Sequence, residues 1–464
     1  MKINKIYESA KDTTSRIQEF KPEDRIQNNK RHIACTIKIN PSQEFNSFDG
    51  FGGALTESSG YVLSFLSEEK RNAVMQAYYS SANGIGYTHA RVHLNSSDFS
   101  LENWACVEKK DETLESFSME RTDKYITPIV KEAQKNTKNY FNLLISPWSP
   151  PAWMKDNGEM NHGGKLLKNY YPLWAKYFVR FIAELKKRDI NTWAVTVQNE
   201  PEAKQVWDSC LYTAQEEAEF AVKHLGPELE KYKNENSLKE KIKIFVWDHN
   251  RDFLWERFSA SMAFEGADKY IDGAAFHWYS GDQYENIEKV SKAWPDKSIV
   301  FTEGCIEGGA RPGAWFPGER YAHNIINDLN HGCTAWIDWN IALDMEGGPN
   351  HVGNFCDAPV LVDTKKGEVL YQSSFYYIGH FSRFIKPKAK RIEFKIDSYR
   401  TPATVDGMMG EMMECCAFKN TDGTITFVVM NRTEADMVFD LNIENDIKTI
   451  KCPPRGIQTI IIEK

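Results

Sequence analysis

A chain of 464 residues exceeds the usual size of a single hydrophobic core, so we expect one large domain and one smaller domain. The formal net charge of −8 provides no basic field for a phosphate backbone or an anionic bilayer, which argues against a nucleic-acid-binding protein. No apolar run reaches the roughly 18 residues of a membrane-spanning helix. Residues 1–20 are charged throughout and lack the apolar stretch of a signal peptide. We therefore expect a cytoplasmic protein without membrane insertion, whose nine cysteines are free thiols.

Apolar runs alternate with helical patterns through the middle of the chain. The runs that we expect to be strands are 48–56, 86–94, 139–148, 191–199, 242–248, 271–279, 298–303 and 333–340. Helical periodicity lies between them, for example in 171–187 and 213–225. Apolar strands that are buried on both faces and alternate with helices indicate a parallel sheet. Eight such units predict an α/β fold, a (β/α)8 TIM barrel with inserted loops.

The two ends of the chain have a different pattern. Short alternating strands with turn signals occupy 416–419, 424–431, 438–443 and 456–462, and one more strand is expected at 32–39. The simplest account is a β-sandwich built from both termini and fused to the barrel. The predicted domains are residues 1–46 with 380–464 for the sandwich, and residues 47–379 for the catalytic barrel.

Two glutamates stand at the ends of the fourth and seventh predicted barrel strands. Glu200 is followed by Pro201, which cannot donate a hydrogen bond to a neighbouring strand, so pairing stops there. Glu303 is followed by Gly304, which allows a sharp turn. Barrel enzymes carry their active sites at the carboxyl ends of the strands, and strands four and seven lie on opposite sides. The two carboxylates are therefore predicted to face each other.

A facing pair of carboxyl groups suits the hydrolysis of glycosidic bonds. One group protonates the leaving oxygen while the other attacks the anomeric carbon or activates a water. The separation of the groups decides between retention, at about 5–5.5 Å, and inversion, at roughly 6.5–9.5 Å. Their pKa values must differ for the two groups to play opposite roles. Asn199, beside Glu200, offers an amide that can hydrogen-bond a sugar hydroxyl.

Long motifs reveal a resemblance at this point. The chain closely resembles glycoside hydrolase family 30, the glucosylceramidases, β-1,6-glucanases and related β-glycosidases of the clan of (β/α)8 retaining enzymes. The matching stretches include FDGFGGA at 48–54, SPWSPPAWMK at 146–155 and GGPN at 347–350. The resemblance covers nearly the whole chain and implies that Glu200 is the acid/base and Glu303 the nucleophile. It also implies that the sandwich is fused to the barrel from both termini.

The resemblance assigns further residues position by position. The residues that it implies in binding the sugar at the cleavage point are Asp98, Trp148, Asn199, Trp339 and Asn354. His277 and Tyr279 match residues that border the nucleophile and are also expected to bind the substrate, and a phenol hydrogen bond from Tyr279 would orient Glu303. Arg91 matches an arginine near the nucleophile, where a cation keeps a carboxylate ionised. His351 departs from the aromatic residue expected in glucosylceramidase-like relatives, which weakens the expectation of a ceramide aglycone.

Each of these residues also has a plainer interpretation. Trp148 and Trp339 are compatible with barrel packing, and His277 with a satisfied buried histidine. Arg91 is compatible with neutralising an acidic barrel. The adjacent Asp248 and His249 are candidate metal ligands, but no third ligand follows at helical or turn spacing. The sequence therefore predicts no metal site and no cofactor.

The predicted function is that of a retaining β-glycoside hydrolase acting on β-glucosides or short β-gluco-oligosaccharides. An alternative keeps the mechanism and changes the substrate to β-1,6-glucan, a β-xyloside or a β-fucoside. A non-enzymatic alternative is an inactive sugar-binding relative, which is disfavoured because Glu200 and Glu303 are both present. The sequence leaves open the linkage, the aglycone, exo or endo action, the oligomeric state and the pathway.

Overall fold

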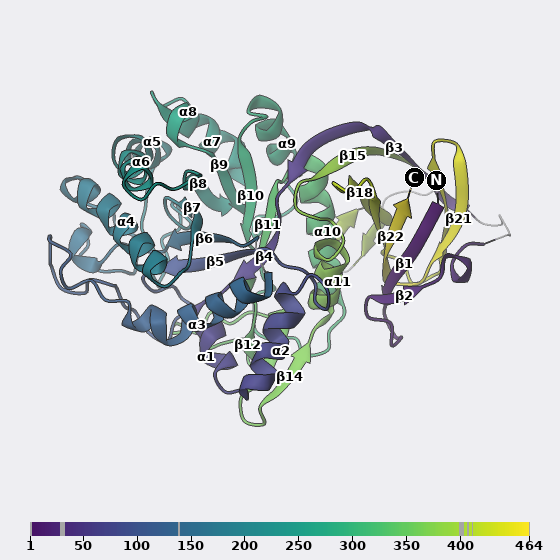
Figure 1. The fold of residues 1–464 in the computed structure, drawn as a ribbon, viewed down its shortest axis with the longest axis horizontal. Helices are drawn as coiled ribbons and strands as arrows, with labels where there is room; N and C mark the ends of the chain where they lie inside the picture. The colour runs from purple at the N-terminus through teal and green to yellow at the C-terminus, as the bar shows by residue number, and fades with distance from the viewer. Residues whose placement is uncertain are drawn as a thin grey trace.

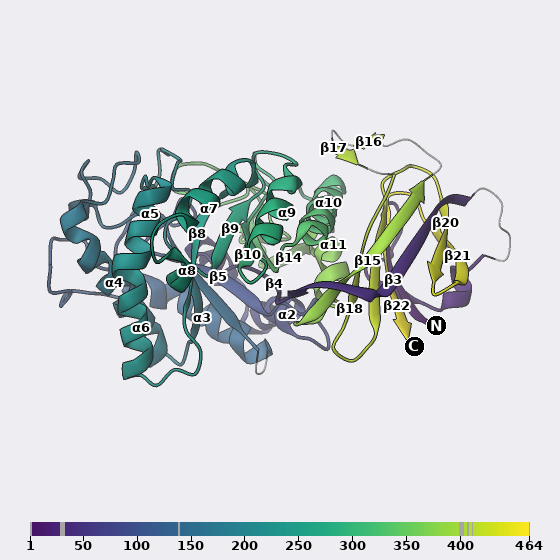
Figure 2. The same ribbon diagram turned by 90° about the horizontal axis from the view of Figure 1, so that it is seen from above.

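The computed structural model describes residues 2–27, 33–137, 140–398, 403–405, 408–410 and 412–463, and it divides into two domains that lie side by side (Figures 1 and 2). A barrel surrounded by helices forms one domain, and a β-sandwich that contains both chain ends forms the other. The first and last strands, β1 (Lys2–Ala10) and β22 (Gly456–Glu463), pair antiparallel inside the sandwich. Among the described residues no helix combines the length and apolarity that crossing a bilayer requires.

The barrel closes from eight parallel strands, as the alternation of apolar runs and helical patterns predicts. Their order around the barrel is β10-β11-β4-β5-β6-β7-β8-β9. The strands are β4 (Gly50–Ala54), β5 (His89–Leu94), β6 (Asn142–Pro147), β7 (Thr192–Thr196), β8 (Lys243–Asn250), β9 (Gly273–His277), β10 (Ser298–Glu303) and β11 (Ala335–Asn340). Each lies within or overlaps the expected run, except that Asn139 of the third run lies outside the described residues. The fold expectation is therefore confirmed.

Helices cover the outside of the barrel (Figure 1). They are α1 (Glu57–Leu63), α2 (Glu68–Tyr79), α3 (Glu120–Thr137), α4 (Tyr171–Lys187), α5 (Ala214–Phe220), α6 (Gly226–Glu235), α7 (Leu254–Met262), α8 (Ala267–Tyr270), α9 (Tyr284–Ala293), α10 (Phe316–His331) and α11 (Ser373–Ser382). The expected helix at 171–187 has the bounds of α4, because its apolar stripe is buried at helical spacing. The expected helix at 213–225 begins at the Thr213 cap, with Glu216 completing a capping box, and continues through a π turn into α6.

The sandwich strands follow the order β2-β1-β22-β19-β18-β15-β3-β20-β21. Besides β1 and β22 they are β2 (Gln18–Phe20), β3 (Ile33–Phe48), β15 (Ala389–Ser398), β18 (Met413–Lys419), β19 (Ile425–Asn431), β20 (Met437–Ile443) and β21 (Asp446–Cys452). The strand expected at 32–39 is the start of β3, although His32 lies outside the described residues. The sequence reading did not identify β1, β15 and β21, whose many charged residues conceal the period-2 pattern.

Short strands complete the description. β12 (Leu343–Asp344), β13 (Val360–Asp363) and β14 (Glu368–Tyr371) form a small sheet after the last barrel strand, and β16 (Ala403–Val405) pairs with β17 (Met408–Gly410). The predicted domain boundary at 46/47 falls near the end of β3, which leads directly into the barrel. The predicted boundary at 379/380 falls within α11.

Buried ion pairs join the two domains. Arg455 of the sandwich pairs with Glu319 of α10, and His323 of α10 lies 2.9 Å from the Glu414 carboxylate on β18. All four side chains are almost completely buried. One apolar core runs from the barrel into the inner sandwich face, where Phe48 contacts Phe418. These buried ion pairs cross from the barrel to the sandwich and hold the two domains together.

Candidate active site

Backbone irregularities at the carboxyl ends of two barrel strands direct side chains into one site. The pairing of β8 with β9 shifts between Trp247 and His249, and Trp247 and Asp248 have left-handed φ values of 79° and 45°. The pairing of β10 with β9 shifts between Phe301 and Glu303. An extra residue in a strand re-aims the neighbouring side chains, and non-glycine residues at positive φ are strained. These backbone irregularities therefore lie at the strand ends that carry Asp248 and Glu303.

Glu303 is held by two hydrogen bonds. Arg91 of β5 donates from Nη1 to Oε2 at 2.7 Å, and the Tyr279 hydroxyl donates to Oε1 at 3.1 Å. Arg91 is completely buried and Glu303 is 7% exposed. Both carboxylate oxygens therefore have a donor, which fixes the orientation of the group. These are the two neighbours that the family resemblance implies for this residue.

Asp248 organises the floor of the site. Its carboxylate accepts hydrogen bonds from Arg91 Nη2 at 2.9 Å, from Thr196 at 2.7 Å and from Thr302 at 2.6 Å. His277 Nε2 lies 3.0 Å from its Oδ1 atom. Burial raises the pKa of Asp248, but the charge of Arg91 and the hydrogen bonds lower it by more. The pKa of Asp248 therefore lies well below its usual range, and the carboxylate is ionised. A buried anion with this many donors positions Arg91 and His277 at the same time.

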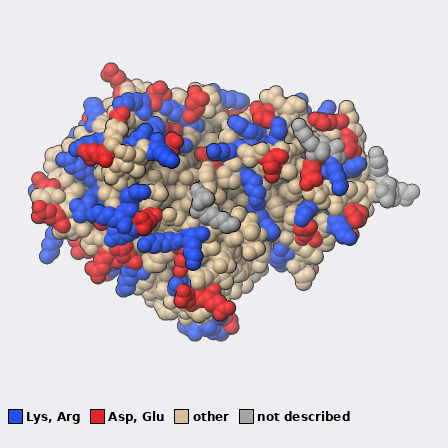
Figure 3. All heavy atoms as spheres, viewed as in Figure 1, with Lys and Arg blue, Asp and Glu red and all other residues tan. Residues whose placement is uncertain are grey.

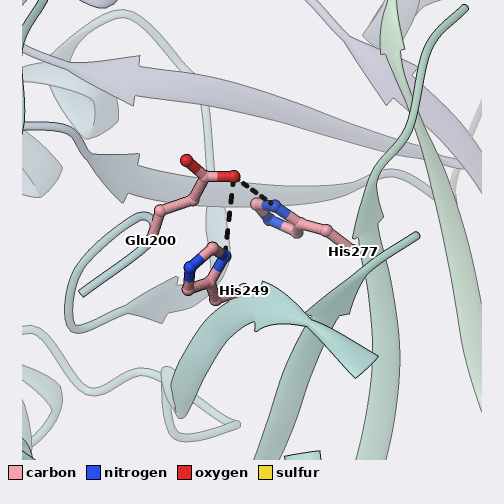
Figure 4. Close-up of side chains that lie close together, drawn as sticks. All are labelled: Glu200, His249 and His277. Carbon is pink, nitrogen blue, oxygen red and sulfur yellow. Dashed lines mark hydrogen bonds and ion pairs between the residues drawn. The ribbon is translucent and has the colours of Figure 1, made fainter. Parts of the chain in front are cut away.

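Glu200 follows β7 in a left-handed conformation, with φ of 48°. Its backbone N–H donates to the Asp248 carbonyl at 2.9 Å, which ties the turn to the end of β8. The Oε1 atom lies 3.3 Å from His277 Nδ1 and 3.6 Å from His249 Nδ1 (Figure 4). The Glu200 side chain is 14% exposed. One carboxylate oxygen therefore contacts two imidazoles from neighbouring strands.

The two glutamates flank one imidazole ring. Glu200 Oε1 contacts Nδ1 of His277, and Glu303 Oε2 lies 4.0 Å from Nε2 of the same ring. The distance between Glu200 Oε1 and Glu303 Oε2 therefore cannot exceed the sum of these two contacts and the distance between the two nitrogens of the His277 ring. Pairs of carboxyl groups that flank one glycosidic bond lie up to roughly 9.5 Å apart. The geometry brings Glu200 and Glu303 together within the range that glycoside cleavage needs.

His277 is cationic at neutral pH. Burial lowers its pKa, but the charge of Glu303 and the hydrogen bonds with Asp248 and Glu200 raise it by more, to about 9. For Glu200, burial raises the pKa, and the contact with His277 followed by the charge of His249 lowers it by more. For Glu303, burial and the charge of Glu200 raise the pKa against the opposing effect of His277 and Arg91. Glu200 and His277 thus form a buried ion pair, with the proton on the imidazole.

Asn199 and Asp98 lie beside the two glutamates. Asn199 accepts a hydrogen bond from Arg91 Nη2 at 2.8 Å through its carbonyl oxygen, which leaves its amide N–H groups to donate to a ligand. Asp98 accepts from the amides of Asn350 at 3.1 Å and Asn354 at 3.2 Å. Burial and the charge of Glu303 raise the pKa of Asp98 to about 8. A carboxyl group in this state can donate as well as accept hydrogen bonds, which suits sugar hydroxyls.

Trp148 and Trp339 stack on each other, with ring centroids 5.3 Å apart and an interplanar angle of 25°. The Arg91 guanidinium lies 4.7 Å from the Trp148 ring and 5.5 Å from the Trp339 ring. Each tryptophan therefore covers one face of the other, and both rings lie against the Arg91 guanidinium. Both rings are almost completely buried, so the described contacts show packing around Arg91.

The structure changes the position expected of His277. It is fully buried, and both ring nitrogens face carboxylates, so it contacts Glu200 and Asp248 and offers no free nitrogen to a sugar. Sequence reasoning missed Asp248 as the organising anion and the hydroxyls of Thr196 and Thr302 that hold it. The signal was present, because Asp248 ends an apolar strand. His351 is almost buried and lies 3.5 Å from Asp208 at the rim.

The part of the chain that the structure describes also has a hollow away from the two glutamates. A hollow at the amino ends of β6, β7 and β8 is lined by residues such as Asn142, Thr192 and Ile242, at the end of the barrel opposite to the glutamates. Lys and Arg are interspersed with Asp and Glu over both domains on the face shown in Figure 3. That face has no continuous basic region of the kind that binds nucleic acid.

Comparisons with known proteins agree with this geometry. The model of the glycosyl hydrolase family 30 TIM-barrel domain matches residues 48–385, and that of the glycosyl hydrolase family 30 β-sandwich domain matches residues 388–460. Lysosomal acid glucosylceramidase of Mus musculus is 31% identical over 430 residues, covering 89% of this chain and 80% of the relative.

Two solved structures are similar over almost the whole chain. SrfJ from Salmonella typhimurium has a TM-score of 0.91 at 33% identity and covers 100% of both chains. The endo-β1,6-glucanase BT3312 has a TM-score of 0.83 at 27% identity and covers 99% of both chains. The similarity extends through the barrel and the sandwich, so it includes both domains and the site between the barrel strand ends.

Proposed function

The chain belongs to glycosyl hydrolase family 30 and is an O-glycosyl hydrolase of the β-glucosidase and glucanase kind, and we propose that it retains anomeric configuration by double displacement. The observation that carries this proposal is the different environment of the two carboxylates. Glu303 has a donor on each oxygen from Arg91 and Tyr279, whereas Glu200 contacts a protonated imidazole. A carboxylate oriented by a donor on each oxygen suits a nucleophile, whereas Glu200 is assigned as the proton donor from its place on the open side of the site, although the charge of His277 lowers its pKa.

In the first step Glu303 attacks the anomeric carbon. The Arg91 guanidinium keeps the carboxylate ionised, and the Tyr279 hydroxyl holds its second oxygen, so the group is oriented before the substrate arrives. Glu200 donates a proton to the leaving oxygen as the glycosidic bond breaks. The aglycone departs and the sugar is bound to Glu303 as an ester.

In the second step Glu200, now ionised, takes a proton from a water that attacks the anomeric carbon. The bond to Glu303 breaks and the carboxylate returns to the hydrogen bonds of Arg91 and Tyr279. Two inversions at one carbon give net retention. Asn199 donates to a sugar hydroxyl during both steps, since Arg91 holds its carbonyl oxygen.

His277 affects the protonation of Glu200. The pair carries one proton near neutral pH, which the imidazole holds, and the charge of His277 lowers the pKa of Glu200. The form with the proton on Glu200 is the acid that assists departure of the aglycone. Asp248 holds the opposite ring nitrogen, which keeps Nδ1 of His277 directed at Glu200. We therefore assign His277 to positioning Glu200, in place of sugar binding.

For the substrate we propose β-glucosides or short β-gluco-oligosaccharides. The glucosylceramidase relative and the hydrogen-bonding group formed by Asp98, Asn199 and Asn354 support a glucose-configured sugar at the cleavage point. Cleavage of β-1,6-linked glucan is the second candidate, favoured by the likeness to the endo-β1,6-glucanase over 99% of both chains. A ceramide aglycone has less support, because His351 occupies a position where an aromatic residue is expected in glucosylceramidases.

The test combines a substrate panel with product stereochemistry. Aryl β-glucoside, β-xyloside and β-fucoside are compared by kcat/KM, and β-1,6-linked gluco-oligosaccharides are compared by product length. Proton NMR of the first product reports its anomeric configuration. We expect the β-glucoside to be preferred and the β-anomer to appear first. An α-anomer as first product would overturn double displacement, and rapid internal cleavage of the β-1,6-linked chains would favour the glucanase candidate.

A further inference from the structure

We propose that Glu200, His249 and His277 form a binding site for a borderline transition-metal ion such as Zn²⁺, and that the bound ion inhibits hydrolysis. The existence of the site is independent of the proposed function, whereas the inhibition rests on the proposed role of Glu200. The three side chains come from the loop after β7, from β8 and from the end of β9, and their rings and carboxylate converge in Figure 4. No sequence spacing joins them, because the barrel brings separate strand ends together.

The donor set matches Zn²⁺ in number and kind. Each residue offers one ligand atom, and the three atoms lie within 4.8 Å of one another. Glu200 Oε1 is 3.3 Å from His277 Nδ1 and 3.6 Å from His249 Nδ1. Ligand atoms of a tetrahedral zinc ion with bonds of about 2.0–2.1 Å lie about 3.3 Å apart. Two imidazoles with one carboxylate leave a fourth position for water, whereas Mg²⁺ and Ca²⁺ require oxygen ligands.

A carboxylate behind His277 prepares the ring for a metal. Asp248 lies 3.0 Å from His277 Nε2 and is itself held by Arg91, Thr196 and Thr302. An Nε2–H bonded to a carboxylate places the lone pair of the neutral ring on Nδ1, which is the atom that faces Glu200. Such carboxylate–histidine pairs orient the ligands of zinc sites and increase their basicity.

His249 provides the second, independent observation. Its Nδ1 atom is buried and has no hydrogen-bond partner among the described residues, although it points toward Glu200. At 3.6 Å the ring nitrogen and the carboxylate oxygen lie beyond hydrogen-bond distance, and an ion bound between them would contact both. The side chains of His249 and Glu200 are 15% and 14% exposed, so an ion can enter from the open side of the site.

The bound ion would occupy the carboxylate oxygen of Glu200 that faces the two imidazoles. With Glu200 Oε1 bound to the metal, the carboxylate can neither donate a proton to the leaving oxygen nor accept one from water. The ion and the proton compete for the same lone pairs, as metal ions and protons do at histidine and carboxylate ligands. Removal of the ion by a chelator frees the carboxylate of Glu200 and restores the activity.

The experiment uses the full-length, tag-free protein. Isothermal titration calorimetry with Zn²⁺ measures affinity and stoichiometry, the absorption of Co²⁺ reports tetrahedral coordination, and Mg²⁺ is the negative cation. His249→Asn removes one ligand, and His162→Asn is the matched control because it removes an exposed imidazole 2.8 Å from Glu159. The hydrolysis rate of each variant with Zn²⁺ is compared with the rate of the same variant without Zn²⁺.

We expect one Zn²⁺ per chain, loss of hydrolysis over the same concentrations, and recovery with a chelator. His249→Asn should weaken both binding and inhibition by at least about tenfold to a hundredfold, and His162→Asn should leave both unchanged. Binding with intact hydrolysis would support the site and contradict the acid/base role of Glu200. Equal Zn²⁺ affinity in His249→Asn and the native protein, or no binding at all, would overturn the site and leave the proposed function standing.

Discussion

Nδ1 of His277 lies 3.3 Å from Oε1 of Glu200, and this contact makes the proposed acid/base one half of a buried pair that holds a single proton. Asp248 on the other ring nitrogen and Glu303 at 4.0 Å stabilise the cationic imidazole and raise its pKa to about 9. The protonation of Glu200 therefore depends on a residue that does not itself touch the glycosidic oxygen. The pH dependence of hydrolysis should therefore reflect the pKa of His277.

The proton of this pair sets the alkaline limit of activity. Hydrolysis requires the proton, so kcat/KM should be full below the pKa of His277 and should fall as the pH rises through about 9. In His277→Gln, burial and the charge of His249 still act on Glu200, and the limit becomes its own pKa. We expect the alkaline limb of the kcat/KM profile to move to lower pH in the variant. An alkaline limb that stays near pH 9 in His277→Gln would show that another group controls it.

Glu303→Gln should abolish turnover while preserving sugar binding. The amide has nearly the shape of the carboxylate but cannot form the glycosyl ester, so we expect the loss in kcat to exceed the roughly 10²–10⁴-fold effect typical of removing a general acid or base. A 2-fluoro glycoside inactivator should label Glu303 in the native protein, as peptide mass spectrometry would report. A label on any other residue would reject Glu303 as the nucleophile.

Glu200→Ala should lower hydrolysis by about 10²–10⁴-fold for substrates with poor leaving groups, because protonation of the leaving oxygen is lost. Azide should restore the rate of the variant with an activated aryl glycoside, since a small anion can attack the glycosyl ester without a base. The native enzyme is the control and should gain nothing from azide. Absence of rescue in Glu200→Ala would count against its assignment.

Tyr279→Phe removes the hydroxyl that donates to Glu303 Oε1 at 3.1 Å. Hydrogen bonds to charged groups contribute about 1.5–3 kcal/mol, which corresponds to a fall in kcat/KM of about tenfold to a hundredfold. We expect most of the loss in kcat, because the bond orients the attacking group. If the loss lay entirely in KM, Tyr279 would bind the sugar and would not position Glu303.

Arg91→Met should destabilise the fold as well as stop catalysis. It leaves Asp248 and Glu303 buried without their cation, and breaking a buried ion pair costs about 3–5 kcal/mol. Thermal unfolding monitored by circular dichroism should show a clear drop in the midpoint. The control is Arg180→Met, whose pairing with Glu184 is partly exposed and contributes at most about 1 kcal/mol. Equal midpoints for the two variants would contradict the structural role of Arg91.

Local pattern was sufficient to predict the eight barrel strands and the positions of Glu200 and Glu303 on strand ends. Buried parallel strands are continuously apolar, and Pro201 and Gly304 mark where the backbone leaves the sheet. The sandwich was harder to read. Strands such as β1 and β15 carry lysine and glutamate on an exposed face, so their apolar residues are few and their partners lie hundreds of residues away, as with Ile6 and Ile460.

The sequence by itself determined the fold class, the two acidic residues and the family, because these depend on periodicity and on motifs that are continuous along the chain. Only the tertiary structure decided how the side chains meet: that His277 contacts Glu200, that Asp248 holds Arg91 and His277, and that His249 Nδ1 lies 3.6 Å from Glu200. The reason is physical. Closing a barrel brings neighbouring strand ends together irrespective of their separation in sequence, and bulges such as the one at Asp248 then set the direction of each side chain.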